Sequence, residues 1–119
     1  MTHWFARPIL CVADVERSVA FYVGKLGFTE AWRHVDDSKL LVAQVEREGC
    51  ALILSCQWPD RNGKGLMFLS LEPPVLDAAR AEFEAKGVAI KEGHWGYRLM
   101  VIEDPDGNQL LFNYPNASA

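Results

Sequence analysis

The sequence has no long hydrophobic run. Its apolar stretches all fall well short of the ~20 consecutive residues that a membrane-spanning helix requires. The first eight residues, MTHWFARP, contain no basic segment followed by an apolar one, so we expect no secretory signal peptide. We therefore predict a protein that does not cross a membrane and works in the cytoplasm.

Basic residues are also few. The chain carries 12 lysine and arginine residues against 16 aspartate and glutamate residues, which gives a formal net charge of −4. Because no basic stripe is present to meet phosphates, we expect no nucleic-acid partner. The mild acidic balance is compatible with a cationic ligand. With 119 residues, 50% of them hydrophobic, the chain is long enough for one globular domain.

The sequence contains few of the residue patterns that are typical of catalytic sites. Cys11, Cys50 and Cys56 are odd in number, form no Cys-x-x-Cys pair and lie in apolar, strand-like surroundings, which indicates reduced and buried thiols. The sequence contains no glycine-rich phosphate loop and no Ser-His-Asp order. No spacing forces two carboxylates to converge into an acid–base pair.

The sequence does contain a pattern that occurs twice. Asp14 is a good N-cap for a first helix that Gly27 ends, and a second helix begins at Pro73-Pro74 and ends at Gly87. Each helix has one predicted strand before it and three after it. These strands cover residues 9–13, 28–35, 40–46, 51–56, 66–71, 88–91, 98–103 and 109–114.

Each half of the chain therefore reads βαβββ, and a shift of 60 residues superimposes one half on the other. We predict an α+β fold of a single domain over residues 1–119, with module 1 at about 5–58 and module 2 at about 65–115. One helix covers only one face of a four-stranded unit. We therefore expect the two modules to pair into a curved mixed sheet around a shared cleft.

Two segments, ILCVADVERSVAFYVGKLGF and WGYRLMVIEDPDGNQLLF, resemble the vicinal oxygen chelate superfamily, which includes glyoxalase I, extradiol dioxygenases and bleomycin-resistance proteins. The resemblance covers nearly the whole chain and implies paired βαβββ modules assembled as a homodimer. Within the second segment, Asp104-Pro105-Asp106-Gly107 also has a purely structural interpretation. Proline at the second position and glycine at the fourth suit a turn that closes a hairpin.

Metal-dependent members of the superfamily hold an ion with four ligands at the inner ends of strands. Carried over by motif, these positions fall on Arg7, Ile53, Leu66 and Leu111. Three aliphatic side chains and a guanidinium cannot replace the histidine and carboxylate ligands of such an ion. We therefore predict no metal and no other cofactor, and we lean against enzymatic activity.

Alternate residues of the strands around the predicted cleft describe an apolar pocket with a few polar points, which suits an organic ligand. The candidate ligand-binding residues on these strands are Arg7, Ile53, Phe68, Leu111 and Asn113. The alternative is that these side chains simply fill the space between the sheets and leave no cavity.

Tryptophan supplies the remaining candidates. Trp95 lies beside a glycine, in a loop flanked by His94 and Tyr97, and Trp32 lies in a predicted strand. An exposed indole can stack on a planar or cationic group, which is worth ~0.5–2 kcal/mol. The resemblance to bleomycin-resistance proteins implies that Trp95 stacks on a drug at a groove between two subunits. Alternatively, Trp95 is a dimer-packing or lid residue and His94 is simply solvated.

We favour a bleomycin-resistance-like protein that sequesters a planar aromatic, antibiotic-like small molecule in clefts at a dimer interface, without a metal. The net negative charge is compatible with a cationic ligand. The alternative is an enzyme of the same superfamily, a lyase, isomerase or dioxygenase, with a metal site that the motifs do not reveal. A third hypothesis is a metal-free enzyme that uses His94 or Tyr97.

Overall fold

The computed structural model describes residues 4–94 and 98–113. These residues form two α-helices, eight strands and one short 3-10 helix, and neither α-helix has the length and apolarity needed to span a bilayer. In chain order the elements are β1 (Ile9–Cys11), α1 (Val15–Gly24), β2 (Thr29–Asp36), β3 (Lys39–Arg47), β4 (Cys50–Ser55), the 3-10 helix η1 (Pro59–Arg61), β5 (Leu66–Leu69), α2 (Pro73–Ala85), β6 (Lys91–His94), β7 (Arg98–Glu103) and β8 (Gln109–Asn113).

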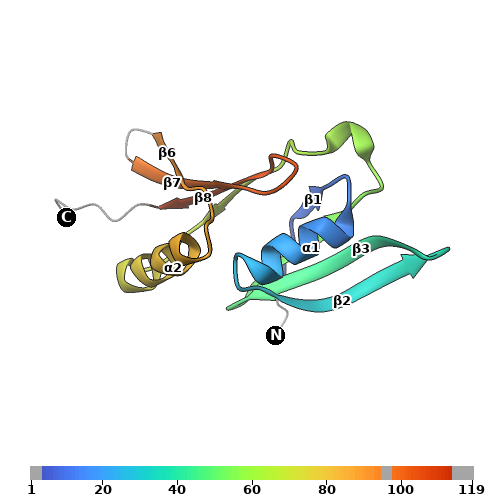
Figure 1. Cartoon of the computed structure of the whole chain (residues 1–119), viewed down its shortest axis with the longest axis horizontal. Coiled ribbons are helices and arrows are strands. Elements are labelled where there is room, and N and C mark those ends of the chain that lie inside the picture. The colour runs from blue at the N-terminus through green and yellow to red at the C-terminus, as the bar shows by residue number, and fades with distance from the viewer. Residues whose placement is uncertain (1–3, 95–97, 114–119) are drawn as a thin grey trace.

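The strands form two four-stranded mixed sheets, which lie in the two halves of the molecule (Figure 1). The first sheet has the order β1-β4-β3-β2 and the second has the order β5-β8-β7-β6. β1 pairs parallel with β4, and β5 pairs parallel with β8. All other neighbouring strands are antiparallel. The predicted α+β fold, with its βαβββ order in each half, is confirmed.

Most elements lie close to the positions that local sequence signals predicted. The Asp14 side chain accepts a hydrogen bond from the Arg17 backbone N–H at 3.1 Å and so caps α1. The main departure is β6, which begins three residues later than predicted. After α2, the N–H of Val88 instead donates to the carbonyl of Phe83, and Gly87 takes a positive φ of 76°. Gly87 thus ends the helix as predicted, and Val88, which the sequence pattern assigned to the strand, is part of the helix-ending motif.

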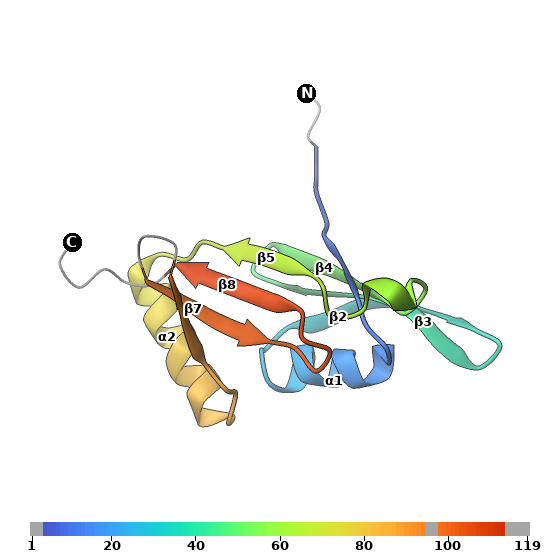
Figure 2. The same cartoon turned by 90° about the horizontal axis from the view of Figure 1, so that it is seen from above.

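Both helices lie on one side of the molecule, and the N-terminal segment extends away from the other side (Figure 2). A continuous cluster of buried side chains joins the halves, with Val15 and Tyr22 from α1 and Leu76 and Phe83 from α2 among its members. Each sheet therefore has one face covered by its helix. The opposite face of each sheet is called its open face below.

The turn at residues 104–108 joins the two halves as well as closing a hairpin. The buried Asp104 carboxylate accepts from the Tyr22 hydroxyl of α1 at 3.1 Å. Asp106 accepts from the Arg17 guanidinium at 3.1 Å, and the Asn108 side chain donates to the last carbonyl of β1 at 3.1 Å. The turn thus fixes module 2 against the start of α1 and the end of β1, which sets the relative position of the two open faces.

Candidate binding face

The open face of the first sheet is identified by strand register. Ile9 of β1 pairs with Ile53 of β4, Ile53 pairs with Gln44 of β3, and Gln44 pairs with Trp32 of β2. Directly paired residues project to the same side of a sheet, so these four side chains form one row across all four strands. The strand neighbours of Ile9, Ile53 and Gln44 belong to the core under α1: they are Leu10, Leu52, Leu54, Ala43 and Val45. The row therefore lies on the face away from the helix.

Gln44 organises the polar part of this face. Its side-chain oxygen accepts from the Arg7 guanidinium at 2.9 Å and from the Trp32 indole N–H at 3.0 Å. Its amide nitrogen donates to the Glu46 carboxylate at 3.1 Å. Gln44 is only 7% exposed, whereas Trp32 is 42% exposed. The buried amide thus holds an exposed guanidinium and a half-exposed indole at fixed positions.

Arg7 and Trp32 were both predicted as binding residues, and the structure brings them together. Gln44 was missed, although a signal was present: it is an isolated amide in the otherwise apolar run from Leu40 to Val45. A buried amide requires hydrogen-bond partners. The sequence pattern alone did not indicate that those partners would be Arg7 and Trp32, which lie 37 and 12 residues away.

The open face of the second sheet is more apolar. Phe68 of β5 pairs with Leu111 of β8, and Leu66 pairs with Gln109, so these side chains share a face. Leu111 is buried, in a small cluster of its own with Leu99 and Val101. Leu66 and Phe68 lie at the sheet edge, and Leu66 is 63% exposed. The predicted residues Phe68 and Leu111 thus occupy neighbouring positions on this face.

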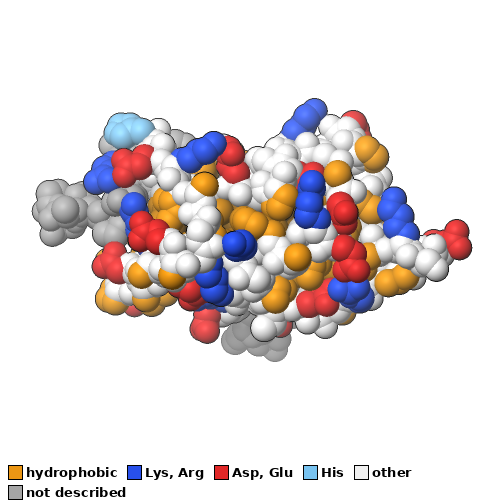
Figure 3. Space-filling view, viewed as in Figure 1, with side chains coloured by type: hydrophobic (Ala, Val, Ile, Leu, Met, Phe, Trp, Pro, Cys, Tyr) orange, Lys and Arg blue, Asp and Glu red, His pale blue; other side chains and the backbone are white. Residues whose placement is uncertain are grey.

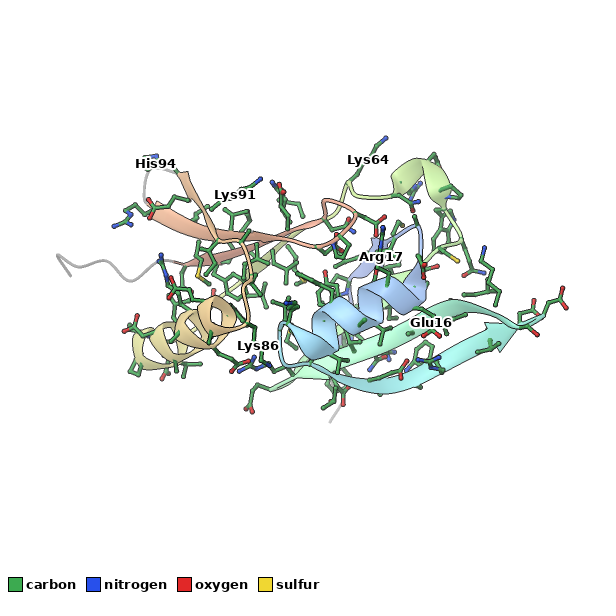
Figure 4. All side chains as sticks on the ribbon, viewed as in Figure 1. Glu16, Arg17, Lys64, Lys86, Lys91 and His94 are labelled. Carbon is green, nitrogen blue, oxygen red and sulfur yellow. The ribbon has the colours of Figure 1, made fainter. Side chains whose placement is uncertain are left out.

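Other predicted site residues have different surroundings. The Asn113 side chain accepts from the Leu71 N–H at 2.9 Å and donates to the Leu71 carbonyl at 2.8 Å, so its amide extends the β5–β8 pairing. His94 lies at the outer end of β6 (Figure 4). It pairs with Arg98, and the alternation of side chains along β7 puts Arg98 on the face of the second sheet that the helix covers. His94 therefore lies on that face and not on the open face. Trp95 and Tyr97 lie outside the described residues.

The four positions to which the resemblance assigned metal ligands carry side chains that do not fit a metal ion. Ile53 lies on the first open face, and Leu111 lies on the second. Together with Leu66 and Arg7, these positions supply three aliphatic side chains and one guanidinium. A guanidinium donates hydrogen bonds and does not bind metal ions. Within the described part of the chain, no three histidine, cysteine, aspartate or glutamate side chains are grouped so that they could hold an ion.

A cavity of about 480 Å³ lies between the two halves. Leu52, Phe68 and Phe83 are among the mostly apolar residues that line it. Arg47 also lines the cavity and forms two hydrogen bonds with the Glu82 carboxylate, at 2.8 and 3.0 Å, which hold the pKa of Glu82 below its usual value. Hydrophobic side chains gather along this junction in the space-filling view (Figure 3). The volume is in the range of small-molecule pockets.

Sequence comparison places this arrangement in a family. The profile of the Glyoxalase/Bleomycin resistance protein/Dioxygenase superfamily matches residues 3–112. The chain belongs to this superfamily. The bleomycin resistance protein of Geobacillus stearothermophilus is 25% identical over 122 residues, covering 88% of this chain and 92% of the relative. The resemblance predicted from the two sequence segments is therefore confirmed.

Solved structures of the superfamily share the fold. The antibiotic-binding protein TnmS3 from Streptomyces sp. CB03234 is 27% identical, with a TM-score of 0.73 over 98% of this chain and 99% of that chain. The bleomycin-binding protein of Streptomyces verticillus, solved with copper(II)-bleomycin, is 24% identical, with a TM-score of 0.72 over 98% of this chain and 100% of that chain.

Proposed function

We propose that this superfamily member binds and sequesters a planar aromatic small molecule against its open faces, without a metal and without making or breaking bonds. The observation that carries the proposal is the convergence of Arg7 and Trp32 on the buried Gln44. Beside them, Ile9 and Ile53 continue the row with apolar side chains. An indole face, an apolar floor and one fixed polar group are the usual components of a small-molecule site.

The relatives support the same class of function. A bleomycin resistance protein and an antibiotic-binding protein match this chain along almost its whole length. By analogy with them, we assign the ligand to the class of antibiotic-like aromatic compounds. Trp95 is the second stacking residue in this proposal, with Tyr97 and His94 beside it in the chain.

We also propose a homodimer in which two copies form the clefts together. Ile9 and Leu66, on the two open faces, are each at least half exposed. Trp4 and Phe5 are almost fully exposed on the N-terminal segment that extends from the body (Figure 2). Exposed apolar side chains in this arrangement are typical of an interaction surface. A second copy would cover them and would enclose the ligand from both sides.

Isothermal titration calorimetry with bleomycin, with and without copper(II), tests the binding function. We expect one site per subunit. Trp95→Ala and Trp32→Ala should each weaken binding by about 3- to 30-fold, which corresponds to the loss of one stacking contact. Trp32→Phe keeps a ring face but loses the N–H donor to Gln44, so it should cost less than Trp32→Ala. If the wild-type protein released no heat with either form of bleomycin, the assignment to this ligand class would be wrong.

Elemental analysis separates this proposal from a metal-dependent enzyme of the same superfamily. Protein purified without a metal-binding tag should carry far less than one equivalent of nickel, zinc, iron or manganese. A stoichiometric ion, together with an activity that a chelator abolishes, would favour the enzyme instead.

A further inference from the structure

The apolar cavity between the two halves lies apart from the row of side chains that carries the proposed function. Its lining includes Leu26, Leu52 and Phe112, which belong to the buried core on the helix side of the sheets. Among the described residues, no member of the row across the first open face lines it. Phe68, at the edge of the second sheet, borders both the cavity and an open face. The cavity therefore lies behind the binding face, on the side of the helices.

The two helices carry different side chains at matching positions, which explains the space. The shift of 60 residues that superimposes the halves places the small Ala79 of α2 on Val19 of α1, and the charged Glu82 on Tyr22. Val19 and Tyr22 are buried over the first sheet. Ala79 is buried as well, and it lines the cavity. α2 therefore brings less apolar volume to its sheet than α1 does.

α2 also packs less closely on its sheet than α1 does. The backbone of α1 comes close to β2, β3 and β4, whereas α2 has no comparably close approach to a strand in the part of the chain that the structure describes. α2 reaches β8 through large side chains, and the ring centroids of Phe83 and Phe112 are 6.2 Å apart. Val75 of α2 lines the cavity and is 52% exposed, so the cavity opens to solvent near the start of this helix.

The charged residues of the lining favour an uncharged ligand. Arg47 donates to the Leu26 carbonyl at 2.6 Å and to both oxygens of the Glu82 carboxylate. Glu48, the other charged residue of the lining, is exposed in the turn between β3 and β4 and keeps its charge in water. An anionic ligand would have to displace Glu82 from Arg47, and burying an unpaired ion in apolar surroundings is costly.

We propose that this cavity is a second ligand site, which takes a compact uncharged molecule with an apolar skeleton. Such a ligand gains dispersion contacts with the lining side chains and buries no charge. Apolar cavities much smaller than this one bind apolar molecules such as benzene. The inference does not rest on the proposed function, because it assigns another class of ligand to another part of the molecule.

Protection of a thiol locates the ligand. Cys50 lines the cavity, whereas Cys56, which is also partly exposed, lies outside its lining. The whole protein is treated with N-ethylmaleimide at mildly alkaline pH, because burial raises the pKa of the Cys50 thiol. Peptide mass spectrometry follows the alkylation of each cysteine, with camphor as the probe. Camphor at about four times its Kd, measured by calorimetry, should slow alkylation of Cys50 about fivefold and leave Cys56 unchanged. Camphor-10-sulfonate, which adds an anion to the same skeleton, should protect neither cysteine.

Variants of α2 test whether the protection comes from the cavity. Ala79→Leu fills part of the cavity and should abolish the effect of camphor on Cys50. Ala81→Leu is the matched control, since it makes the same change at an exposed position of α2, and it should keep the protection. Val75→Asp is the second variant should Ala79→Leu lower the unfolding midpoint. A carboxylate in the first turn suits the helix dipole, but it makes the apolar lining charged, so protection should again be lost.

Three results would overturn the inference. Camphor could fail to protect Cys50 in the wild type, or could protect it equally in Ala79→Leu and Val75→Asp. Equal protection by the sulfonate would show that the site does not select an uncharged ligand. Protection that followed protein concentration instead of camphor would identify a second copy of the chain as the occupant. All of these results concern the cavity alone, because bleomycin titration decides the proposed function separately.

Discussion

Replacing Tyr22 by phenylalanine removes one buried hydroxyl from the contact between the two halves of the molecule. The hydroxyl donates to one Asp104 oxygen at 3.1 Å, and the Asn108 side chain donates to the same oxygen at 2.9 Å. The other Asp104 oxygen accepts from the N–H groups of Asp106 and Asn108. Burial, with the Asp104 carboxylate nearby, raises the pKa of Tyr22 above its ordinary value. The hydroxyl therefore keeps its proton and stays a donor throughout the usual pH range.

The cost of this change follows from the contact. A hydrogen bond to a charged group contributes about 1.5–3 kcal/mol to stability. In Tyr22→Phe the Asp104 carboxylate keeps its other three donors, so we expect the lower part of this range, about 2 kcal/mol. For a domain of this size, that loss corresponds to a fall in Tm of about 8 °C.

Ser18→Ala is the matched control, because it also removes one hydroxyl from the buried side of α1. Ser18 is fully buried, and its hydroxyl has no hydrogen-bond partner among the described residues. An unpaired buried hydroxyl costs free energy, and alanine is the better helix former, so this variant should be neutral or more stable. Tyr22→Phe should therefore lower the free energy of unfolding, whereas Ser18→Ala should leave it unchanged or raise it.

Urea denaturation followed by circular dichroism measures both variants. Protein concentration must be held constant, because the stability of the proposed homodimer would depend on it. If Tyr22→Phe and Ser18→Ala differed by less than about 0.5 kcal/mol, the Tyr22–Asp104 bond would not contribute as a charge-assisted contact. The turn at 104–108 would then join the halves through its other contacts alone.

Two further predictions concern the same junction. Gly63 has a φ of 75°, and a Cβ there would collide with a backbone carbonyl oxygen of the 104–108 turn; Gly63→Ala should therefore lose about 2–4 kcal/mol in urea denaturation. The control Gly24→Ala, which has open space around it at the end of α1, should gain about 0.5 kcal/mol, and equal effects would contradict the predicted collision. Because Arg47 lowers the pKa of Glu82, the pair stabilises the protein above the unfolded-state pKa of a glutamate, and this contribution is lost as pH falls through the lowered value. The stability difference between wild type and Glu82→Gln should therefore be about 0.5–1 kcal/mol at pH 7 and disappear near pH 3, whereas a difference independent of pH would exclude this charge effect.

The positions of helices and strands follow from short-range patterns, and the sequence predicted them with small shifts. The capping by Asp14, the alternation along 98–103 and 109–113, and the 104–107 turn each depend on neighbouring residues. β6 was misplaced because a short stretch with three apolar residues, Val88 to Ile90, does not distinguish a strand from the end of a helix. In the structure, Gly87 and Val88 close α2, and the strand begins only afterwards.

The sequence by itself determined the βαβββ repeat, the family and the aliphatic side chains at positions 53, 66 and 111, since these depend on residue type and spacing along the chain. Only the tertiary structure decided which polar groups meet. Gln44 accepts hydrogen bonds from both Arg7 and Trp32, and the Asn113 side chain forms two hydrogen bonds with the backbone of Leu71. These hydrogen bonds depend on strand register and on the packing of one segment against another, and residues so far apart in the chain leave no periodic signal of their contact.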